Sequence, residues 1–173
     1  IEKENESFNE ISYSILFLAR HSIEIGFKAN IVYFKKYSKI NDCNNSDIHF
    51  LKALFGCFKS HINKTIINLK NDYDVIIDKT DLIELKKYCS KIEKMIDVFE
   101  IIDFSSQNLR YPINTNKEVV YKEKLIVDLF EIKEMFDSSI ILLTYTNSLF
   151  SKYTDYKDTI DEIYRDELMA NNF

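Results

Sequence analysis

The fold is decided by residues 20–29, which read Arg-His-Ser-Ile-Glu-Ile-Gly-Phe-Lys-Ala. Placed at 100° per residue, the apolar side chains around this stretch fill most of a helix circumference. The polar side chains share one narrow arc, made of Arg20, His21, Glu24 and Lys28. A helix that is apolar nearly all round is usually buried, so this arc must meet water, a groove or partner side chains. The stretch predicts a long first helix over about residues 7–38.

The composition predicts an all-α fold. The chain has 173 residues, with only two glycines and one proline. So few turn formers indicate long uninterrupted elements and disfavour a β-sandwich or a doubly wound sheet. Hydrophobic residues make up 46% and charged residues 29%, which is typical of a soluble globular protein. We therefore expect one helical domain over residues 1–173.

Apolar side chains three and four residues apart predict the other helices. Residues 1–6 read as a solvated lead-in. The second helix is expected over about 46–71 with Ser46 as its N-cap, and the third over about 80–102. A fourth helix is expected from about 125 to 152, followed by a more polar fifth over about 155–170. Together these elements predict an up-and-down helical bundle of about five helices.

Two segments break the helical pattern. Val75-Ile76-Ile77 favours a short extended piece between the second and third helices. Residues 103–120 are polar and contain Pro112, which is excluded from a helix interior. We expect this excursion to be irregular or to form a β-hairpin from residues 109–113 and 118–121.

Charge and cysteine content limit the partners and the compartment. The formal net charge of −5 makes non-specific binding to DNA unfavourable, because phosphate contacts need concentrated Lys and Arg. No apolar run reaches the roughly 18 residues that span a membrane, and no signal peptide is visible at the start of the chain. Three cysteines without paired spacing favour free thiols in a reducing compartment. We expect a cytoplasmic protein with no membrane partner, no cofactor and no metal.

The polar arc of the first helix has two interpretations. Arg20 and Glu24 are four residues apart, as are Glu24 and Lys28, so all can touch on one face. A surface salt-bridge ladder would contribute only a few tenths of a kcal/mol per pair. The alternative is a polar seam inside a groove that positions a phosphate or a base. The sequence alone favours the ladder, and the narrowness of the arc favours the seam.

Other candidate residues are also ambiguous. His49 is either a site residue or a polar residue in a first helical turn. Cys57 and His61 have the spacing of two metal ligands, but a core cysteine and a hydrogen-bonded histidine are the simpler interpretation. Arg110 and Tyr111 suit phosphate gripping and base stacking. Alternatively, Tyr111 pins the loop to the bundle and Arg110 pairs with a carboxylate.

Both glycines fall inside predicted helices. Each of Gly26 and Gly56 costs about 1 kcal/mol of helix propensity relative to alanine. We therefore expect each to mark a close helix crossing.

Three short motifs resemble those of HEPN domains (higher eukaryotes and prokaryotes nucleotide-binding). Residues 21–29 carry a Glu followed four positions later by Lys-Ala, and residues 48–54 place a His before a Leu at a helix start. Residues 109–112 contain Arg-Tyr-Pro, which is found in a later loop of many members. The resemblance covers roughly residues 11–113 and leaves the two C-terminal helices without a family motif.

The resemblance implies a small helical domain, often a homodimer, associated with nucleotides or RNA. Many relatives are toxins or components of prokaryotic antiviral defence. Catalytic members are metal-independent ribonucleases with an Arg followed four to six residues later by His, and this chain lacks that pair. The implied function is RNA or nucleotide binding without the usual ribonuclease catalysis. The ligand-binding residues would be Arg20, His21, Glu24, Lys28, His49, Arg110 and Tyr111.

Two other functions stay open. One is a ribonuclease that uses Arg110 with His21 or His49. The other is a non-catalytic structural or interaction protein that acts through dimerisation or a protein partner. A binding site predicts that the polar arc and Arg110 converge on one concave, electropositive patch. An interaction protein predicts scattered surface ion pairs and an exposed apolar helix face.

Overall fold

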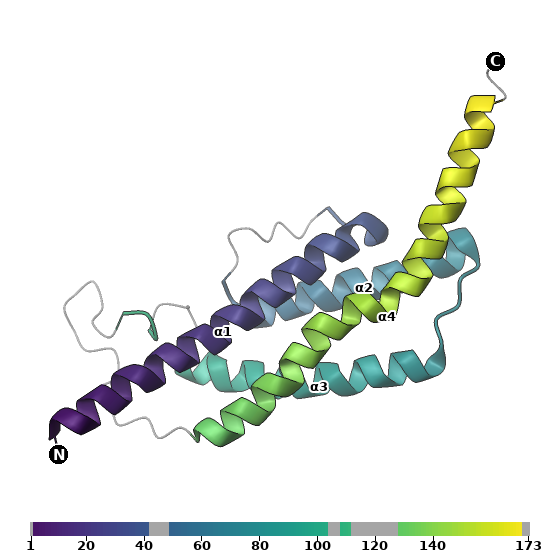
Figure 1. The fold of residues 1–173 in the computed structure, drawn as a ribbon. Coiled ribbons are helices and arrows are strands. Elements are labelled where there is room, and N and C mark those ends of the chain that lie inside the picture. Colours follow the sequence, from purple (N-terminus) through teal and green to yellow (C-terminus); the bar gives the residue numbers. More distant parts are fainter. Residues whose placement is uncertain (1, 42–48, 104–107, 112–127, 171–173) are drawn as a thin grey trace.

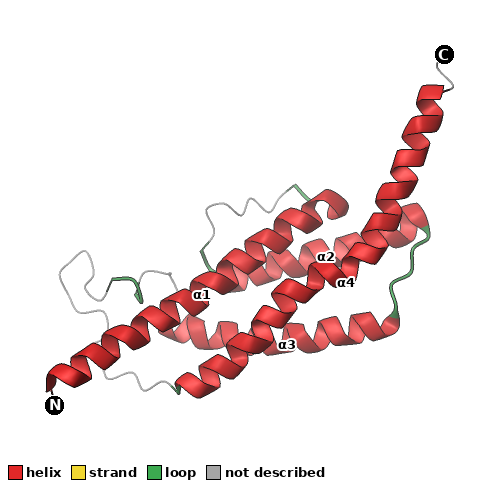
Figure 2. Cartoon of the chain, in the orientation of Figure 1, coloured by secondary structure: helices red, strands yellow, loops and turns green. Residues whose placement is uncertain are grey.

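The protein is an all-helical bundle, seen here in a computed structural model (Figures 1 and 2). The structure describes residues 2–41, 49–103, 108–111 and 128–170, with side chains from residue 12 onward. The described residues form four helices: α1 (Glu2–Ser38), α2 (Leu51–Tyr73), α3 (Lys79–Ile102) and α4 (Leu129–Ala170). The predicted fold class is therefore confirmed, with four helices in place of about five.

The helices do not alternate strictly in direction. Figure 1 shows α1, α2 and α4 running in one sense and α3 in the other. Two contacts show that α1 and α2 run in the same direction. Arg20, near the middle of α1, bonds to His49 just before α2. Ser38, at the end of α1, contacts His61 near the middle of α2. The most extensive packing joins α1 to α2 and α3 to α4, and α1 also packs on α4. The N-terminus and the C-terminus lie at opposite ends of the molecule.

Aromatic rings fill the centre of the bundle. Phe27 lies with its ring centroid 5.5 Å from that of Phe58 on α2. Phe34 makes an edge contact with Phe150 on α4 at 5.1 Å. These rings are completely buried, and each aromatic pair adds about 0.5–1.5 kcal/mol beyond its area burial. The core therefore ties α1 to both of its neighbours.

One of the two glycines marks a close crossing. A Cβ at Gly26 would lie 2.7 Å from Leu143 Cδ1, so α1 and α4 approach closely there. Beside it, the Asn30 side chain donates a 2.7 Å hydrogen bond to the Leu143 carbonyl. Gly56 has no neighbour within 4 Å of such a Cβ, so the predicted crossing is wrong at that position.

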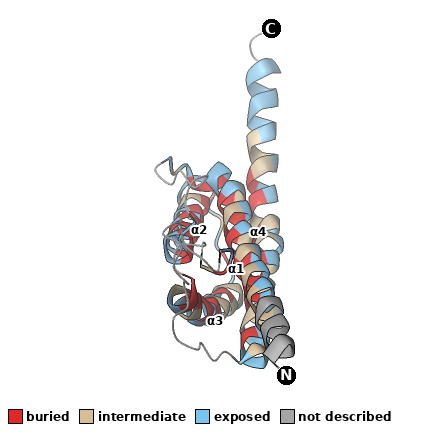
Figure 3. Ribbon diagram, turned by 90° about the vertical axis from the view of Figure 1, so that its left-hand side faces the viewer, coloured by how far each residue is buried: buried red, intermediate tan, exposed pale blue. Residues whose placement is uncertain are grey.

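The predicted fourth and fifth helices are one continuous helix, α4. The break expected between Lys152 and Asp155 is absent because the polar residues there face the bundle. Thr154 is buried, and its hydroxyl lies 2.7 Å from that of Tyr33. One turn later, Asp158 accepts a 2.6 Å hydrogen bond from Lys36. Beyond these contacts the end of α4 projects from the bundle, and its surface is exposed (Figure 3).

Helix α2 begins later than predicted. Its first residue is Leu51, preceded by Phe50 in an extended conformation with no side-chain cap. Ser46, the expected N-cap, lies outside the described residues. The backbone at His49 stays non-helical because its carbonyl accepts a hydrogen bond from α1. Helix α1 itself begins at Glu2, so the expected lead-in over residues 1–6 is mostly helical.

The non-helical segments agree in part with expectation. Residues 74–78 have no regular secondary structure, and Ile77 is buried under the bundle while Ile76 is exposed. Helix α3 follows with Asp78 as its N-cap, accepting a hydrogen bond from the backbone of Thr80. Residues 108–110 form a turn. The rest of the predicted hairpin, from residue 112, lies outside the described residues.

The expectation of free thiols is wrong for one cysteine. Cys57 on α2 is disulfide-bonded, whereas Cys89 on α3 is free. The third cysteine, Cys43, lies outside the described residues. Burial raises the pKa of the Cys89 thiol to about 11, so that thiol is unreactive at neutral pH. The disulfide also removes the argument from cysteine chemistry for a reducing, cytoplasmic location.

Candidate functional site

The predicted site residues gather around Arg20, which is buried with only 1% of its surface exposed. All three nitrogens of its guanidinium group donate hydrogen bonds. Nε donates to the Asp103 carbonyl at 3.0 Å, and Nη1 donates to the Glu24 carboxylate at 3.1 Å. Nη2 donates to the His49 carbonyl at 2.7 Å. Arg20 therefore joins α1 to the entry of α2 and to the end of α3.

Glu24 is the second centre of the cluster. Its buried carboxylate accepts one hydrogen bond from Arg20 and, at Oε1, a 2.8 Å bond from Lys28. The same Oε1 lies 2.8 Å from His49 Nδ1. Burial acts to raise the pKa of the Glu24 carboxyl, but the hydrogen bonds from Lys28 and His49 outweigh it and lower the pKa below its usual value. Glu24 is therefore held ionised between three donors.

Asp103 completes the buried charges. It follows the last residue of α3, is 1% exposed, and has its carboxylate 3.7 Å from Arg20 Nε. The other carboxylate oxygen accepts a 2.9 Å hydrogen bond from the backbone of Asn108. Asp103 thus connects Arg20 to the turn that carries Arg110.

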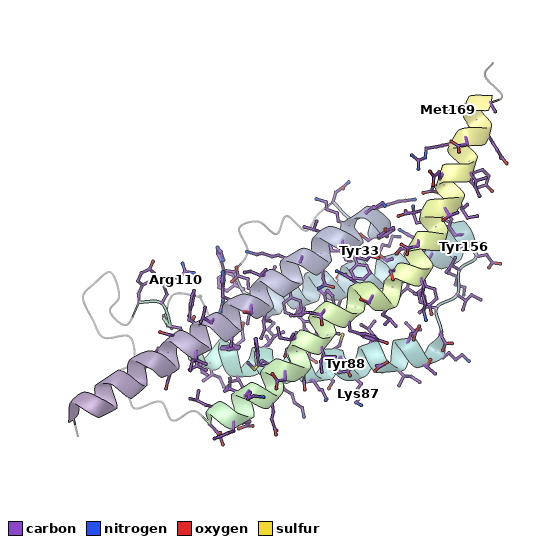
Figure 4. The ribbon with its side chains drawn as sticks, viewed as in Figure 1. Tyr33, Lys87, Tyr88, Arg110, Tyr156 and Met169 are labelled. Atoms are coloured by element: carbon purple, nitrogen blue, oxygen red, sulfur yellow. The ribbon has the colours of Figure 1, made fainter. Side chains whose placement is uncertain are left out.

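Arg110 and His21 meet across Phe17 on α1. The Arg110 guanidinium carbon lies 4.9 Å from the centroid of the Phe17 ring. His21 stacks on Phe17 with ring centroids 5.5 Å apart and planes inclined by 10°. In Figure 4, Arg110 lies beside α1 at the end of the bundle opposite the C-terminus. A planar cation is thus placed next to an aromatic ring and an imidazole.

The cluster has a buried base and an exposed rim. Arg20, Glu24 and Asp103 are inaccessible to a ligand. The His49 side chain is 57% exposed, Tyr111 is 55% exposed, and Arg110 is exposed. Lys28 is the least exposed residue of the rim, with its side chain 24% exposed. Any ligand would contact the rim, where the buried Glu24 carboxylate holds Lys28 and His49 in place.

The sequence interpretations are corrected in two ways. The arc on α1 is neither a surface ladder nor an open groove, because Arg20 and Glu24 are buried against partner groups. The alternative reading of the loop is also wrong. Leu109 is the buried anchor, while Tyr111 is exposed and Arg110 has no carboxylate partner among the described residues.

Sequence reasoning missed two contributors. Asp103 carried a weak signal, since it is an acid placed directly after the apolar stripe of the third helix. Phe17 is four residues before His21, a spacing that brings two side chains together on one helical face. Neither signal would have separated these residues from ordinary helix-end and core positions.

The pair Cys57 and His61 does not form part of this site. His61 is buried, and its Nδ1 lies 2.7 Å from the Ser38 hydroxyl. Burial, with a smaller contribution from the Lys35 charge, lowers the pKa of this imidazole. Within the described residues, His, Cys, Asp and Glu side chains form no group of three or more with the arrangement of a metal site.

Comparison of the chain with protein-family models, with curated proteins and with solved structures finds no match in any of the three. In the described part of the chain, none of the helices combines the length and the hydropathy needed to cross a lipid bilayer.

Proposed function

We propose that this chain binds RNA, or the phosphate of a nucleotide, at the rim formed by Lys28, His49, Arg110 and Tyr111. One observation carries the proposal: the single buried carboxylate of Glu24 fixes Lys28 and His49 side by side at the surface. Side chains that are already positioned lose little entropy when a ligand binds.

The charge balance of the cluster supports an anionic ligand. Arg20 and Lys28 offset the carboxylates of Glu24 and Asp103. Arg110 adds a further permanent positive charge at the exposed edge. Because the whole chain is acidic, such a local cation is a better phosphate site than the protein surface at large.

The chemistry of the rim suits single-stranded RNA. A guanidinium group offers a planar fork of donors to a phosphate, and it also stacks on bases. The exposed phenol of Tyr111, next in the chain, provides a second stacking surface. The motif resemblance to HEPN domains points to the same class of ligand and to a role in a toxin or antiviral-defence system.

One arrangement in the structure bears on ribonuclease activity, which is distinct from RNA binding. Arg110 and His21 both lie against Phe17, so a cation and a potential general base share one edge of the cluster. Arg20 cannot act in this way, because its three donor nitrogens are already bonded inside the protein. The proposed function is binding, and cleavage is measured alongside it.

The test is fluorescence anisotropy with a labelled single-stranded RNA pool, comparing the native chain with Arg110→Ala. We expect about a tenfold higher Kd for the variant, the loss typical of one base or phosphate contact. Lys87→Ala is the matched control, since Lys87 is an exposed cation on α3, away from Arg110 in Figure 4.

Failure of the native chain to bind, or an equal loss in Lys87→Ala, would overturn the proposal. The same RNA run on a denaturing gel shows whether it is cut. Cleavage by the native chain that disappears in His21→Ala would extend the function to a ribonuclease with an Arg110 and His21 pair.

A further inference from the structure

A pocket of about 260 Å³ lies between α2 and α3. It shares no residue with the charged cluster around Arg20 or with the rim. The pocket has room because α2 and α3 pack on each other much less extensively than α1 packs on α2 or α3 on α4. At about 30 Å³ per heavy atom, which is the share of one water molecule in the liquid, it holds roughly nine heavy atoms. The pocket therefore has the size of a small molecule and is too small for a peptide helix.

The floor of the pocket is formed by aliphatic side chains and one thiol. Ile62 and Leu85 are buried, and Ile66, Leu82 and Cys89 are partly buried against the core. Burial raises the pKa of the Cys89 thiol to about 11, so this group is uncharged at neutral pH. None of the described residues that line the pocket is aromatic. Such a floor favours a saturated hydrocarbon chain, which gains free energy by leaving water.

The mouth of the pocket is polar and positively charged. Lys59 and Asn63 from α2 and Lys86 from α3 line it, and all three are exposed. Among the described residues, the Lys86 ammonium and the Asn63 amide have no hydrogen-bond or ion-pair partner. Two such donors at the opening of an apolar pocket are the arrangement by which small-molecule sites orient a ligand.

On one side of the pocket, ion pairs cross from α2 to α3. Lys52 Nζ lies 4.0 Å from Asp97 Oδ1, and Lys59 Nζ lies 3.8 Å from Glu93 Oε1. The two helices run in opposite directions (Figure 1), and the next cation back along the same edge of α3 is Lys86, seven residues before Glu93. The α2 residues that line the pocket with Lys86 include no acid. The series of ion pairs therefore ends at the pocket, with a lysine that lacks a carboxylate.

The surroundings keep the mouth positive. Helix α2 contains no Asp or Glu from Leu51 to Asn71. The two acids that precede Lys86 on α3 both face α4, where Glu84 accepts a 3.3 Å hydrogen bond from Tyr145 and Asp81 lies 2.7 Å from the Lys152 ammonium. A negatively charged head group at the mouth therefore meets unpaired positive charge, although the whole chain is acidic.

We propose that this pocket binds a small aliphatic carboxylate. The hydrocarbon chain lies on the aliphatic floor, and the carboxylate lies at the mouth beside Lys86 and Asn63. It supplies the negative charge that Lys86 lacks, and it accepts a hydrogen bond from the Asn63 amide. This site is separate from the proposed RNA site, because no residue belongs to both.

The experiment is a titration of the native chain with octanoate, below the concentration at which octanoate forms micelles. Binding is followed by NMR of labelled isoleucine and leucine methyl groups. We expect shift changes to concentrate on the four aliphatic residues of the floor, Ile62, Ile66, Leu82 and Leu85. The methyl groups of Leu18 and Ile76, which are exposed outside the pocket, should not change.

Charge at the mouth is tested with a matched pair of variants. Lys86→Glu should raise the Kd for octanoate about tenfold, because it replaces an attraction by a repulsion of similar size. Lys87→Glu is the control, since it makes the same change of net charge at the neighbouring exposed position, which does not line the pocket. Octylammonium, with a similar chain and the opposite charge, should bind the native pocket more weakly than octanoate. The methyl spectrum of each variant also shows that it is folded.

Three results would overturn the proposal. They are a native chain that does not bind octanoate at the floor residues, an equal loss of affinity in Lys86→Glu and Lys87→Glu, and binding of octylammonium in the pocket as tight as that of octanoate. Arg110→Ala should leave the Kd for octanoate unchanged, so failure of this site and failure of RNA binding are distinguishable.

Discussion

Two regions of the same helix invert the usual distribution of residues. The inward side of α1 buries the charged pair Arg20 and Glu24, while its outward side exposes Leu18, Ile25 and Val32. Position on the helix explains both, because residues 20 and 24 share the arc that contacts α2 and α3. Burial along α1 therefore depends on which neighbouring helices contact each side, and residue type alone does not decide it.

Burying the charges of Arg20 and Glu24 has a desolvation cost, which their hydrogen bonds offset. Buried ion pairs lose hydration, and their mutual attraction compensates only where every donor and acceptor is satisfied. The cluster meets that condition in part: each of the three guanidinium nitrogens of Arg20 donates a hydrogen bond to a different segment, but Oδ2 of Asp103 is buried with no hydrogen-bond partner among the described residues. An aliphatic residue in place of Arg20 would not bond to the carbonyl of His49. The exposed aliphatic side chains on the outward side of α1 make no comparable contacts, and they lie open to solvent.

The largest expected effect comes from breaking the inward side. Arg20→Ala should lower the free energy of unfolding by about 3–5 kcal/mol, because Glu24 and the carbonyls of His49 and Asp103 lose a buried donor. Leu18→Ala should change it by less than about 0.5 kcal/mol, since that side chain is exposed. Urea unfolding of the two variants beside the native chain measures both changes.

Arg20→Lys sharpens the same comparison. Lysine keeps the positive charge but loses the planar fork, so we expect a loss between those of the other two variants. Equal losses for Arg20→Ala and Leu18→Ala would mean that the buried cluster contributes no more than an exposed leucine. The contrast between the two sides would then be unfounded.

The contacts of the cluster that lie within α1 could be predicted from the sequence, because residue spacing decides which side chains are neighbours on a helix. Arg20, Glu24 and Lys28 are spaced by four, which places them in contact on any helix. The partners from other segments depend on tertiary packing, which no periodicity encodes. Asp103 joined the cluster only because α3 ends next to α1. For the same reason the sequence did not distinguish a surface ladder from a buried network.

Helix number and exposure were harder to predict. A change from apolar to polar composition near Lys152 suggested a break, yet polar residues remain helical when they have partners, as Thr154 does with Tyr33. The outward face of α1 was expected to be buried because nearly the whole helix is apolar. The four helices of the described residues leave one apolar side of α1 uncovered, so its side chains are exposed.

A smaller effect follows from the ionisation of Glu24. Its folded-state pKa is lowered below the ordinary value of 4.5, so its contribution to stability is full above about pH 4.5. That contribution is lost as the pH falls through the folded-state pKa. Unfolding free energies of the native chain and of Glu24→Gln should therefore converge as the pH is lowered from 6 to 3. A constant difference across that range would show that Glu24 is not held ionised by Lys28 and His49.

The smallest effect is expected from replacing the two glycines, because Gly26 faces α4 and Gly56 faces open space. Gly56→Ala should raise the free energy of unfolding by roughly 0.5–1 kcal/mol, because alanine has the higher helix propensity and the new Cβ meets nothing within 4 Å. Gly26→Ala gains the same propensity, but its Cβ would lie 2.7 Å from Leu143 Cδ1 and 3.2 Å from Leu143 Cβ. The Leu143 side chain must shift and disturb the crossing of α1 and α4, so the propensity gain is offset and the net change should be a loss. Thermal unfolding of the two variants side by side decides the matter, since equal stabilisation would mean that α1 and α4 are not in close contact at Gly26.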